Sequence, residues 1–320
     1  MTAKIRWTTF RQYRGPFIKG EIPFSLSEDR RESHVDRAFW LTSKVETGAK
    51  FGSVMAYDGT AMTAGLDQHI AVYPKELAHE DFNPKDDQGG LWQLLRQLEC
   101  IGNDGQLDAA IKSLWDAFEE QGWYLAQDGL LRYLEDVPEQ HSAGDIVFGH
   151  EIRDTFTPLK GKVADKDKLI AERWIRLFHD VFEAPGGFGA QIEFGRSHLV
   201  ERARRWGVYW AYGDKEITVL KAGQNLSLET DLALCMYHSH SVNAPAKAIK
   251  LLRRAGNRAH NAVNPKKLIK LLGTSKYGRW DDDIPNGRYQ RTRAAARASG
   301  LWPRRFFDGP NAIMPGNLPG

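Results

Sequence analysis

The stretch that most constrains this fold runs from Val45 to Gly65, where a helical pattern gives way to glycine-punctuated, strand-like sequence. Ahead of it, Ser33 can cap a helix, because its hydroxyl can accept a hydrogen bond from a backbone N–H of the first turn. Gly48 is placed to end the same helix, so Glu46 falls in its last turn. Apolar and small side chains recur between these caps at three- and four-residue spacing and predict one buried face: Val35, Ala38, Phe39, Thr42 and Val45.

Glu46 occupies a poor position for helix stability, because the C-terminus of a helix repels negative charge. A misfit of this kind hints at function, although exposed glutamates near helix ends are common. Beyond the helix, a strand, an Asp-Gly hairpin turn and a returning strand can follow one another within residues 51–65. The pattern therefore predicts a cleft with Glu46 on one wall and Asp58 and Thr63 on the other.

Two carboxylates on opposite walls of a cleft match the needs of glycosidic-bond hydrolysis. One carboxyl group stays protonated and donates to the leaving oxygen, while the other activates a water molecule or attacks the sugar. A hydroxyl such as that of Thr63 can hold the attacking water. The alternative interpretation is structural: an ordinary helix, a type I′ hairpin and a coincidental spacing.

The same residues resemble the catalytic segment of the lysozyme-like glycoside hydrolases. Glu46 followed by D-G-T-A-M-T-A-G at residues 58–65 is similar to the pattern of the chitosanases, a Glu followed by D-G-x-x-x-T-A-G. Phage-type lysozymes carry a looser version, with a shorter Glu-to-Asp interval and T-x-G after it. The resemblance implies that Glu46 is the general acid, Asp58 the base and Thr63 the water-positioning hydroxyl. The Glu46-to-Asp58 interval lies between those of the two families, so the resemblance does not decide which polysaccharide is the substrate.

The remaining sequence favours an α+β protein that is mostly α, with helices segregated from a short antiparallel sheet. This agrees with the two-lobed lysozyme-like fold, in which a small antiparallel β-lobe and a larger helical lobe enclose the saccharide cleft. We expect residues 1–32 to form an N-terminal arm and residues 33–320 to form the catalytic domain. That domain would contain a central insertion at roughly 74–225 and a basic, helical C-terminal region.

Amphipathic spacing and turn residues predict the further elements of the chain. Residues 66–73 can form a third strand, residues 206–220 are typical of a hairpin, and residues 123–134 fit either a helix or a strand. Further helices are predicted at 91–101, 107–118, 166–182, 228–240, 265–272 and 289–299, and after a cap at Asn243.

Metal and cofactor chemistry find little support in the sequence. His238 and His240 invite a metal site, but residues two apart on a helix point to different faces. The two cysteines, Cys100 and Cys235, cannot build a metal framework; they could pair in an oxidising space, but we expect two buried thiols. We therefore expect no metal and no cofactor. Substrate-binding roles are assigned to Tyr57, Gln68, His69, Tyr237 and His238.

The overall charge of +3 conceals a strong asymmetry. Residues 241–320 carry 16 Lys and Arg against 4 Asp, whereas residues 1–240 carry 28 Lys and Arg against 37 Asp and Glu. A basic region suits an anionic polymer, either peptidoglycan with its attached teichoic acids or nucleic acid. A solvated helical face is the plain alternative.

Targeting signals are not evident in the sequence. The N-terminus has no apolar core of signal-peptide type, and no apolar run is long enough for a membrane span. We expect synthesis in a cytoplasm and delivery to the cell wall by lysis, by a virion or by a secretion machine.

These expectations combine in a muramidase that cuts the β-1,4 bonds of peptidoglycan by an inverting mechanism, as a phage lysin or an exported antibacterial effector. Its partners would be the glycan strands, with a delivery system, a virion or an immunity protein as further candidates. A chitosanase is the alternative in the same class, disfavoured because polycationic chitosan calls for an acidic cleft. A nucleic-acid or structural binding protein that uses the basic C-terminal region is the alternative from another class.

Overall fold

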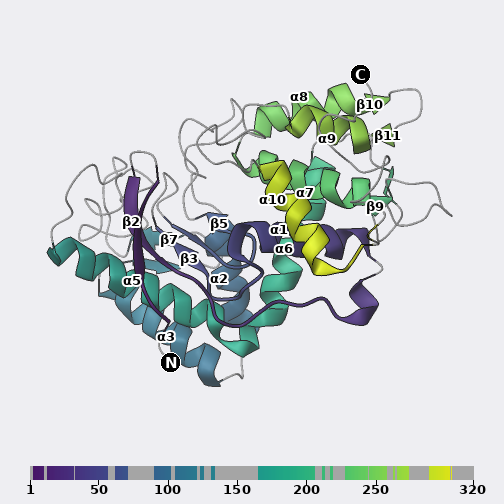
Figure 1. The fold of residues 1–320 in the computed structure, drawn as a ribbon. Coiled ribbons are helices and arrows are strands. Elements are labelled where there is room, and N and C mark those ends of the chain that lie inside the picture. The colour runs from purple at the N-terminus through teal and green to yellow at the C-terminus, as the bar shows by residue number, and fades with distance from the viewer. Residues whose placement is uncertain are drawn as a thin grey trace. The chain divides into compact units, whose positions relative to one another are not determined.

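Figure 1 shows the fold of the chain in a computed structural model. Contacts within the chain divide it into two compact units. The first comprises Met1–Phe24 and Lys50–Phe194, and the second comprises Ser25–Ala49 and Gly195–Gly320. The functional divisions predicted at residues 1–32 and 74–225 stay predictions. The structure describes residues 3–10, 13–31, 33–56, 62–70, 90–101, 105–120, 123–125, 131–133, 165–205, 211–212, 217–218, 228–243, 245–257, 262–263, 265–273, 288–302 and 304.

The first unit contains a five-stranded antiparallel sheet in the order β1-β2-β3-β4-β5. β1 and β2 form a hairpin from residues that the sequence pattern assigns to an arm, and β2 pairs with β3 where Ile18 lies opposite Val54. Both of these side chains are buried, so this part of the N-terminal segment belongs to the folded body. The strands are β1 Arg6–Phe10, β2 Tyr13–Ile18, β3 Val54–Met55, β4 Thr63–Ala64 and β5 His69–Ile70.

Helix α5 packs on this sheet against β2, β3 and β4, and also contacts α3. The core that these elements share is aromatic. The ring centroid of Phe118 lies 4.7 Å from that of Trp174 and 5.9 Å from that of Trp92. The three helices predicted here are confirmed, and the ambiguous segment contains a hairpin. The elements are α2 Gly90–Ile101, α3 Gly105–Glu119, α5 Asp165–Glu183, β6 Trp123–Leu125 and β7 Leu131–Tyr133.

Helix α7 is the central helix of the second unit, where it packs against α1, α8, α9 and α10. Its residues 231–238 are all buried, as expected for a largely apolar helix surrounded by other helices. The helices and the hairpin predicted in this unit are confirmed where the structure describes them, although Asn243, predicted as the cap of the next helix, is the last residue of α7. The elements are α1 His34–Thr47, α7 Leu228–Asn243, α8 Pro245–Ala255, α9 Pro265–Gly273, α10 Arg288–Ser299, β8 Ala211–Tyr212, β9 Ile217–Thr218, β10 Gly256–Asn257 and β11 Ala262–Val263.

Helix α1 begins and ends at the capping residues that the sequence predicts. The Ser33 hydroxyl accepts a hydrogen bond from the backbone N–H of Asp36. Gly48 adopts the left-handed conformation of a helix C-cap, with φ 76°, and its N–H donates to the Lys44 carbonyl. Ala49 follows with φ 56°, so two left-handed residues in succession turn the chain sharply. The predicted face is buried at Val35, Ala38, Phe39 and Thr42 and half-buried at Val45.

Helix α6 (Phe188–Arg205) is an element that the sequence pattern does not predict. The Pro-Gly-Gly run at 185–187 predicts only a helix end, but it forms a 3-10 turn after which α6 begins. A Cβ on Gly187 would lie 2.9 Å from Cδ2 of Leu98, so the glycine allows close packing at this turn. The Pro-Gly-Gly run, which looks like a helix breaker in the sequence, is thus a short connection between α5 and α6.

The described elements form a mostly helical α+β protein with a small antiparallel sheet, as predicted. Cys100 differs from the expectation of two buried thiols, because it is exposed while Cys235 is buried. Within the part of the chain that the structure describes, no helix is both long enough and apolar enough to cross a membrane.

Candidate functional site

Glu46 lies in the last turn of α1, as predicted, and its side chain is half-buried. Side-chain hydrogen bonds hold the turn around it. Thr47 Oγ1 donates to the Ser43 carbonyl over 2.9 Å, and Lys44 Nζ donates to the Gly48 carbonyl over 3.4 Å. The backbone beneath the predicted general acid is therefore well fixed within the second unit.

Thr63 opens strand β4 in the first unit, and the residue is 3% exposed. Its hydroxyl donates to Oε1 of Gln68 over 2.9 Å. The two residues flank the turn between β4 and β5, in which Gly65 has φ 84° and Gln68 has φ 60°. The backbone N–H of Gln68 closes this turn on the Gly65 carbonyl at 3.4 Å. The hydroxyl predicted to position water is thus buried and oriented.

His69, the third predicted site residue in this hairpin, is held in packing contacts. Its Nε2 lies 2.5 Å from Oδ1 of Asp67, and both side chains are buried. The ring of Phe194 meets the imidazole edge-on, with 4.8 Å between ring centroids. The structure therefore brings Thr63, Gln68 and His69 together, with His69 turned into the interior of the first unit.

The other predicted site residues are placed differently. Tyr57 and Asp58 lie outside the described residues. Tyr237 and His238 lie on α7 in the second unit and are 1% and 2% exposed. Such burial is typical of packed side chains. Their assignment as substrate contacts stays a prediction and carries no part of the function proposed below.

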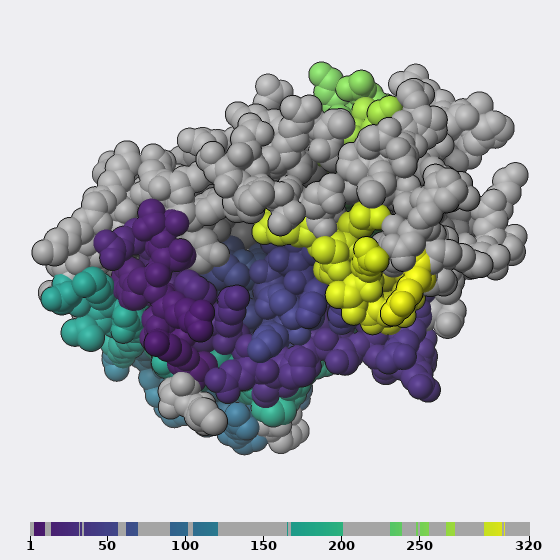
Figure 2. Space-filling view, viewed as in Figure 1, coloured from purple at the N-terminus to yellow at the C-terminus, as the bar shows by residue number. Residues whose placement is uncertain are grey.

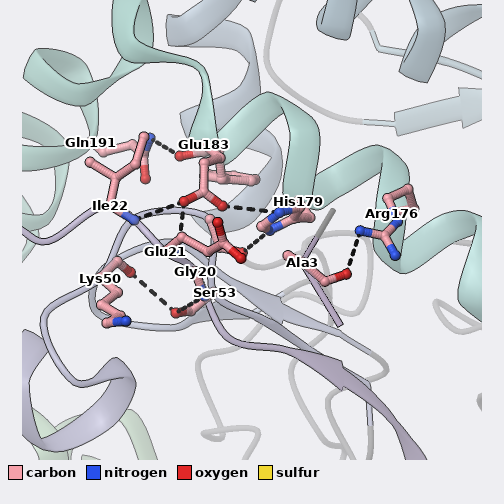
Figure 3. Close-up of polar contacts among 12 residues, drawn as sticks. Ala3, Gly20, Glu21, Ile22, Lys50, Ser53, Arg176, His179, Glu183 and Gln191 are labelled. Carbon is pink, nitrogen blue, oxygen red and sulfur yellow. Dashed lines mark hydrogen bonds and ion pairs between the residues drawn. The ribbon is translucent and has the colours of Figure 1, made fainter. Parts of the chain in front are cut away.

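A buried His179 and a half-buried Glu183 on α5 hold the segment that leads into β3 (Figure 3). Nδ1 of His179 lies 2.6 Å from the Gly52 carbonyl oxygen, and its Nε2 lies 3.0 Å from Oε2 of Glu183. Oε1 of Glu183 accepts hydrogen bonds from the backbone N–H groups of Glu21 (2.7 Å) and Ile22 (2.9 Å). We call these five residues the His179–Glu183 clamp. It joins α5 to two segments that lie at least 127 residues earlier in the chain.

The electrostatics of the clamp favour the charged pair. Burial by itself lowers the pKa of His179, but contacts with Glu183 and the Gly52 carbonyl outweigh burial and raise this pKa above its usual 6.5. Burial by itself raises the pKa of Glu183, but hydrogen bonds from His179 and two backbone N–H groups outweigh it and hold this pKa below 4.5.

Two glycines let the backbone segments of the clamp approach one another. A Cβ on Gly20 would lie 1.4 Å from the Phe51 carbonyl oxygen, and a Cβ on Gly52 would lie 2.5 Å from Oε2 of Glu183. Gly52 also has φ 70°, which disfavours other residues. Sequence reasoning missed the clamp. Its local signal is the i, i+4 spacing of His179 and Glu183 on a predicted helix, but that spacing does not reveal the distant partners.

A second charge cluster, which is buried and which we call the Arg37–Asp231 network, joins α1 to α7 in the second unit. Nε of Arg37 lies 2.7 Å from Oδ2 of Asp231, and these side chains are 1% and 0% exposed. Nε1 of Trp302 donates to the same oxygen over 2.7 Å, and the Arg37 guanidinium also donates to the Arg31 carbonyl. The network fixes the helix that carries Glu46 within its unit.

Helices α8, α9 and α10, which we call the cationic helices, concentrate positive charge in the second unit. Their sequences contain 11 Lys and Arg and no Asp or Glu. In α8 the apolar residues Leu251 and Leu252 are buried while Arg253 and Arg254 are exposed, so the charge faces solvent. Figure 2 shows α10, in yellow, open on the face in view. The exposed cations among the described side chains of these helices are Lys250, Arg253, Arg254, Lys267, Arg291 and Arg297.

Among the described residues, no group of three or more His, Cys, Asp or Glu side chains is arranged to hold a metal ion. Comparisons with protein-family models, with curated proteins and with solved structures found no match for this chain.

Proposed function

We propose that this protein is a glycoside hydrolase that cleaves the β-1,4 bonds of bacterial peptidoglycan with inversion of configuration. Glu46 is the general acid, Asp58 the general base, and Thr63 the hydroxyl that holds the attacking water. The observation that carries the proposal is the buried, oriented hydroxyl of Thr63, on a hairpin that follows in sequence a helix with Glu46 in its last turn. The corresponding fold is lysozyme-like, with a small β-lobe and a larger helical lobe.

The setting of Glu46 supports its role as the acid. Helix α1 is capped at both ends and anchored through the Arg37–Asp231 network, so the carboxyl group is carried on a rigid element. Rigid elements hold catalytic groups in productive geometry more precisely than loops do. The side chain of Glu46 is half-buried, which leaves it accessible to a substrate.

The setting of Thr63 supports its role in holding water. Thr63 lies opposite Met55 on β3 and opposite Ile70 on β5, so its backbone is paired on both sides. A threonine hydroxyl offers one donor and two acceptor positions. Donation to Gln68 leaves the acceptor positions available for a water molecule.

In the proposed reaction, Glu46 donates its proton to the glycosidic oxygen as the bond from that oxygen to the anomeric carbon breaks. The water held by Thr63 attacks the anomeric carbon from the opposite face and passes a proton to Asp58. Inverting enzymes hold their two carboxyl groups about 6.5–9.5 Å apart to leave room for this water. Proton exchange with solvent then restores both carboxyl groups.

The cationic helices favour peptidoglycan over chitosan as the polymer. Their 11 Lys and Arg attract the anionic wall and its teichoic acids, whereas chitosan is a polycation and is repelled. A wall-directed enzyme of this kind reaches its substrate through lysis, a virion or a secretion machine. An immunity protein that inhibits the enzyme in the producing cell is a further partner in this proposal.

The cationic helices also favour a second candidate function, which is binding of nucleic acid without catalysis. Such binding would weaken steeply with salt, because cations released from the nucleic acid drive it. Two results together would favour this candidate over hydrolysis. The protein would bind DNA in a salt-dependent way that Glu46→Gln leaves unchanged, and it would not cleave peptidoglycan.

The test is incubation of the purified protein with peptidoglycan sacculi and, separately, with chitosan, followed by identification of the new reducing ends. We expect muramic acid reducing ends from sacculi and little release from chitosan. Glu46→Gln should lower turnover about 100- to 10,000-fold, the usual contribution of a general acid, while keeping the fold. Glu172→Gln is the matched control, because Glu172 is also a half-buried helical glutamate and contacts Trp7 instead of a substrate. Equal turnover by wild type and Glu46→Gln would contradict the proposal.

A further inference from the structure

Gln68 holds an unusual backbone conformation at the end of the β4–β5 turn. Its φ is 60°, in the left-handed region that costs about 1–2 kcal/mol for a residue with a side chain. Glycine adopts this conformation without the cost, as Gly65 does in the same turn with φ 84°. A glutamine at this position therefore needs a side-chain interaction that offsets the strain.

The interaction is the hydrogen bond between Gln68 and Thr63. Oε1 of Gln68 accepts the proton of the Thr63 hydroxyl over 2.9 Å. Nε2 of Gln68 is buried and has no hydrogen-bond partner among the described residues. The contact with Thr63 is therefore the hydrogen bond that orients this amide in the described structure.

This contact decides which way a water molecule bound to Thr63 must point. A threonine hydroxyl has one proton to donate, and here Gln68 takes it. Thr63 can then interact with water only as an acceptor, so the water must donate one of its protons to Thr63. Its other proton is left for a general base, and a lone pair is left for the carbon under attack.

We propose that Gln68 is a positioning residue that fixes the hydroxyl of Thr63 as an acceptor and thereby orients the nucleophilic water. This rests on the hydrolytic function proposed above. In the attack, the water oxygen forms a bond to the anomeric carbon, the bond to the leaving oxygen breaks, one water proton goes to Asp58, and the second stays on the new hydroxyl. Gln68 and Thr63 exchange no proton with the substrate.

Two substitutions separate this role from a structural one. Gln68→Gly removes the side chain and also the backbone strain, so we expect a melting temperature no lower than that of the wild type. Its kcat should fall about 10- to 100-fold with KM unchanged, because the water loses its orientation while sugar contacts remain. Gln68→Glu keeps an acceptor oxygen facing Thr63 and should restore most of the lost kcat.

The matched control is Gln191→Leu, which removes another glutamine of the first unit. Gln191 is buried, and its Nε2 donates to the Phe182 carbonyl over 2.9 Å. Its loss should lower the melting temperature and leave kcat unchanged, the reverse of the result expected for Gln68→Gly.

The experiment measures kcat, KM and melting temperature on soluble peptidoglycan fragments for wild type, Gln68→Gly, Gln68→Glu, Gln191→Leu and Glu46→Gln. An unchanged kcat for Gln68→Gly overturns the positioning role while hydrolysis stands. An equal loss in Gln68→Gly and Gln68→Glu overturns the acceptor orientation of Thr63, again with hydrolysis standing. Equal release of reducing ends by wild type and Glu46→Gln, or none by either, overturns the proposed function and the role of Gln68 with it.

Discussion

Each unit is stabilised internally by a cluster of charged side chains, and the two clusters differ in chemistry. The His179–Glu183 clamp of the first unit uses an imidazole, whose charge changes near neutral pH. The Arg37–Asp231 network of the second unit uses a guanidinium, which stays charged wherever proteins fold. Near neutral pH, the unit that carries Thr63 should therefore respond to pH through its clamp, whereas the guanidinium that anchors the helix carrying Glu46 stays charged.

The largest expected effect comes from breaking the Arg37–Asp231 network. Asp231→Ala leaves a buried guanidinium without its carboxylate and removes the acceptor of Trp302. We expect the free energy of unfolding to fall by about 3–5 kcal/mol, as when one partner of a buried ion pair is removed. Urea denaturation followed by circular dichroism measures the change.

The double variant Arg37→Met/Asp231→Leu serves as its control, because it removes both charges and leaves none unpaired. It should recover much of the loss caused by Asp231→Ala, since apolar residues of similar volume often replace a buried pair without cost. If the double variant is even less stable than Asp231→Ala, the hydrogen bonds and packing of the network stabilise the fold beyond the pairing of its two charges.

The next effect tests the close packing of the clamp. Gly52→Ala places a Cβ 2.5 Å from Oε2 of Glu183 and also forces alanine into φ 70°, so we expect a loss of about 2–4 kcal/mol. Gly48→Ala shares the left-handed backbone, with φ 76°, but its Cβ has nothing within 4 Å. It should cost only about 1–2 kcal/mol. Equal losses in urea denaturation would show that the clamp tolerates displacement of Glu183.

A smaller effect concerns pH. The pKa of His179 is raised, so its contribution to stability is fully present below the unfolded value of 6.5 and is lost as pH rises through the folded pKa. The pKa of Glu183 is lowered, so its contribution is present above the unfolded value of 4.5 and is lost as pH falls through the folded pKa. The clamp therefore stabilises most between these two values.

Unfolding free energies from pH 3 to about 9 in wild type and His179→Gln measure this contribution. The difference between the two proteins should shrink as pH rises above 6.5. The Arg37–Asp231 network predicts no such trend for the double variant described above. A difference for His179→Gln that is constant across this range would contradict the charged clamp.

The smallest effect on stability is expected in the cationic helices. Arg253 and Arg254 are exposed in the last turn of α8, so Arg253→Gln/Arg254→Gln, which places no negative charge at a helix C-terminus, should change the melting temperature only slightly. Binding to sacculi should weaken and lose much of its salt dependence, because exposed charges are screened within about 8 Å at physiological ionic strength. Co-sedimentation at several salt concentrations measures binding, and hydrolysis of short oligosaccharides should stay unchanged.

Local chemistry made some of these features predictable from sequence. Ser33 and Gly48 were predicted as the caps of α1 because capping depends on residues a few positions apart. Asp36 and Arg37 are charged residues beside an apolar stripe, yet both are buried. Their partners, Arg196 and Asp231, lie at least 160 residues away, which no local pattern reveals.

For the candidate site as well, the sequence predicts features that depend on neighbouring residues and does not predict contacts between distant ones. The motif predicts Thr63 and its neighbours as site residues because its signal is contained in a short segment, and that assignment stays a prediction. The orienting contact from Gln68 depends on the left-handed backbone of a short turn, and the clamp depends on Glu183 meeting Glu21 and Ile22. Helix α6 was missed because glycines that permit close packing also look like helix breakers.

The central claim is that Thr63 holds a water molecule that attacks the sugar from the side opposite to the acid. Proton NMR of the first product formed from a β-linked peptidoglycan fragment tests this claim directly. Inversion predicts that the α-anomer appears first and then equilibrates with the β-anomer, and that Thr63→Ala slows its formation without weakening saccharide binding. An initial β-anomer from the wild type would contradict the role of Thr63 and indicate a retaining mechanism.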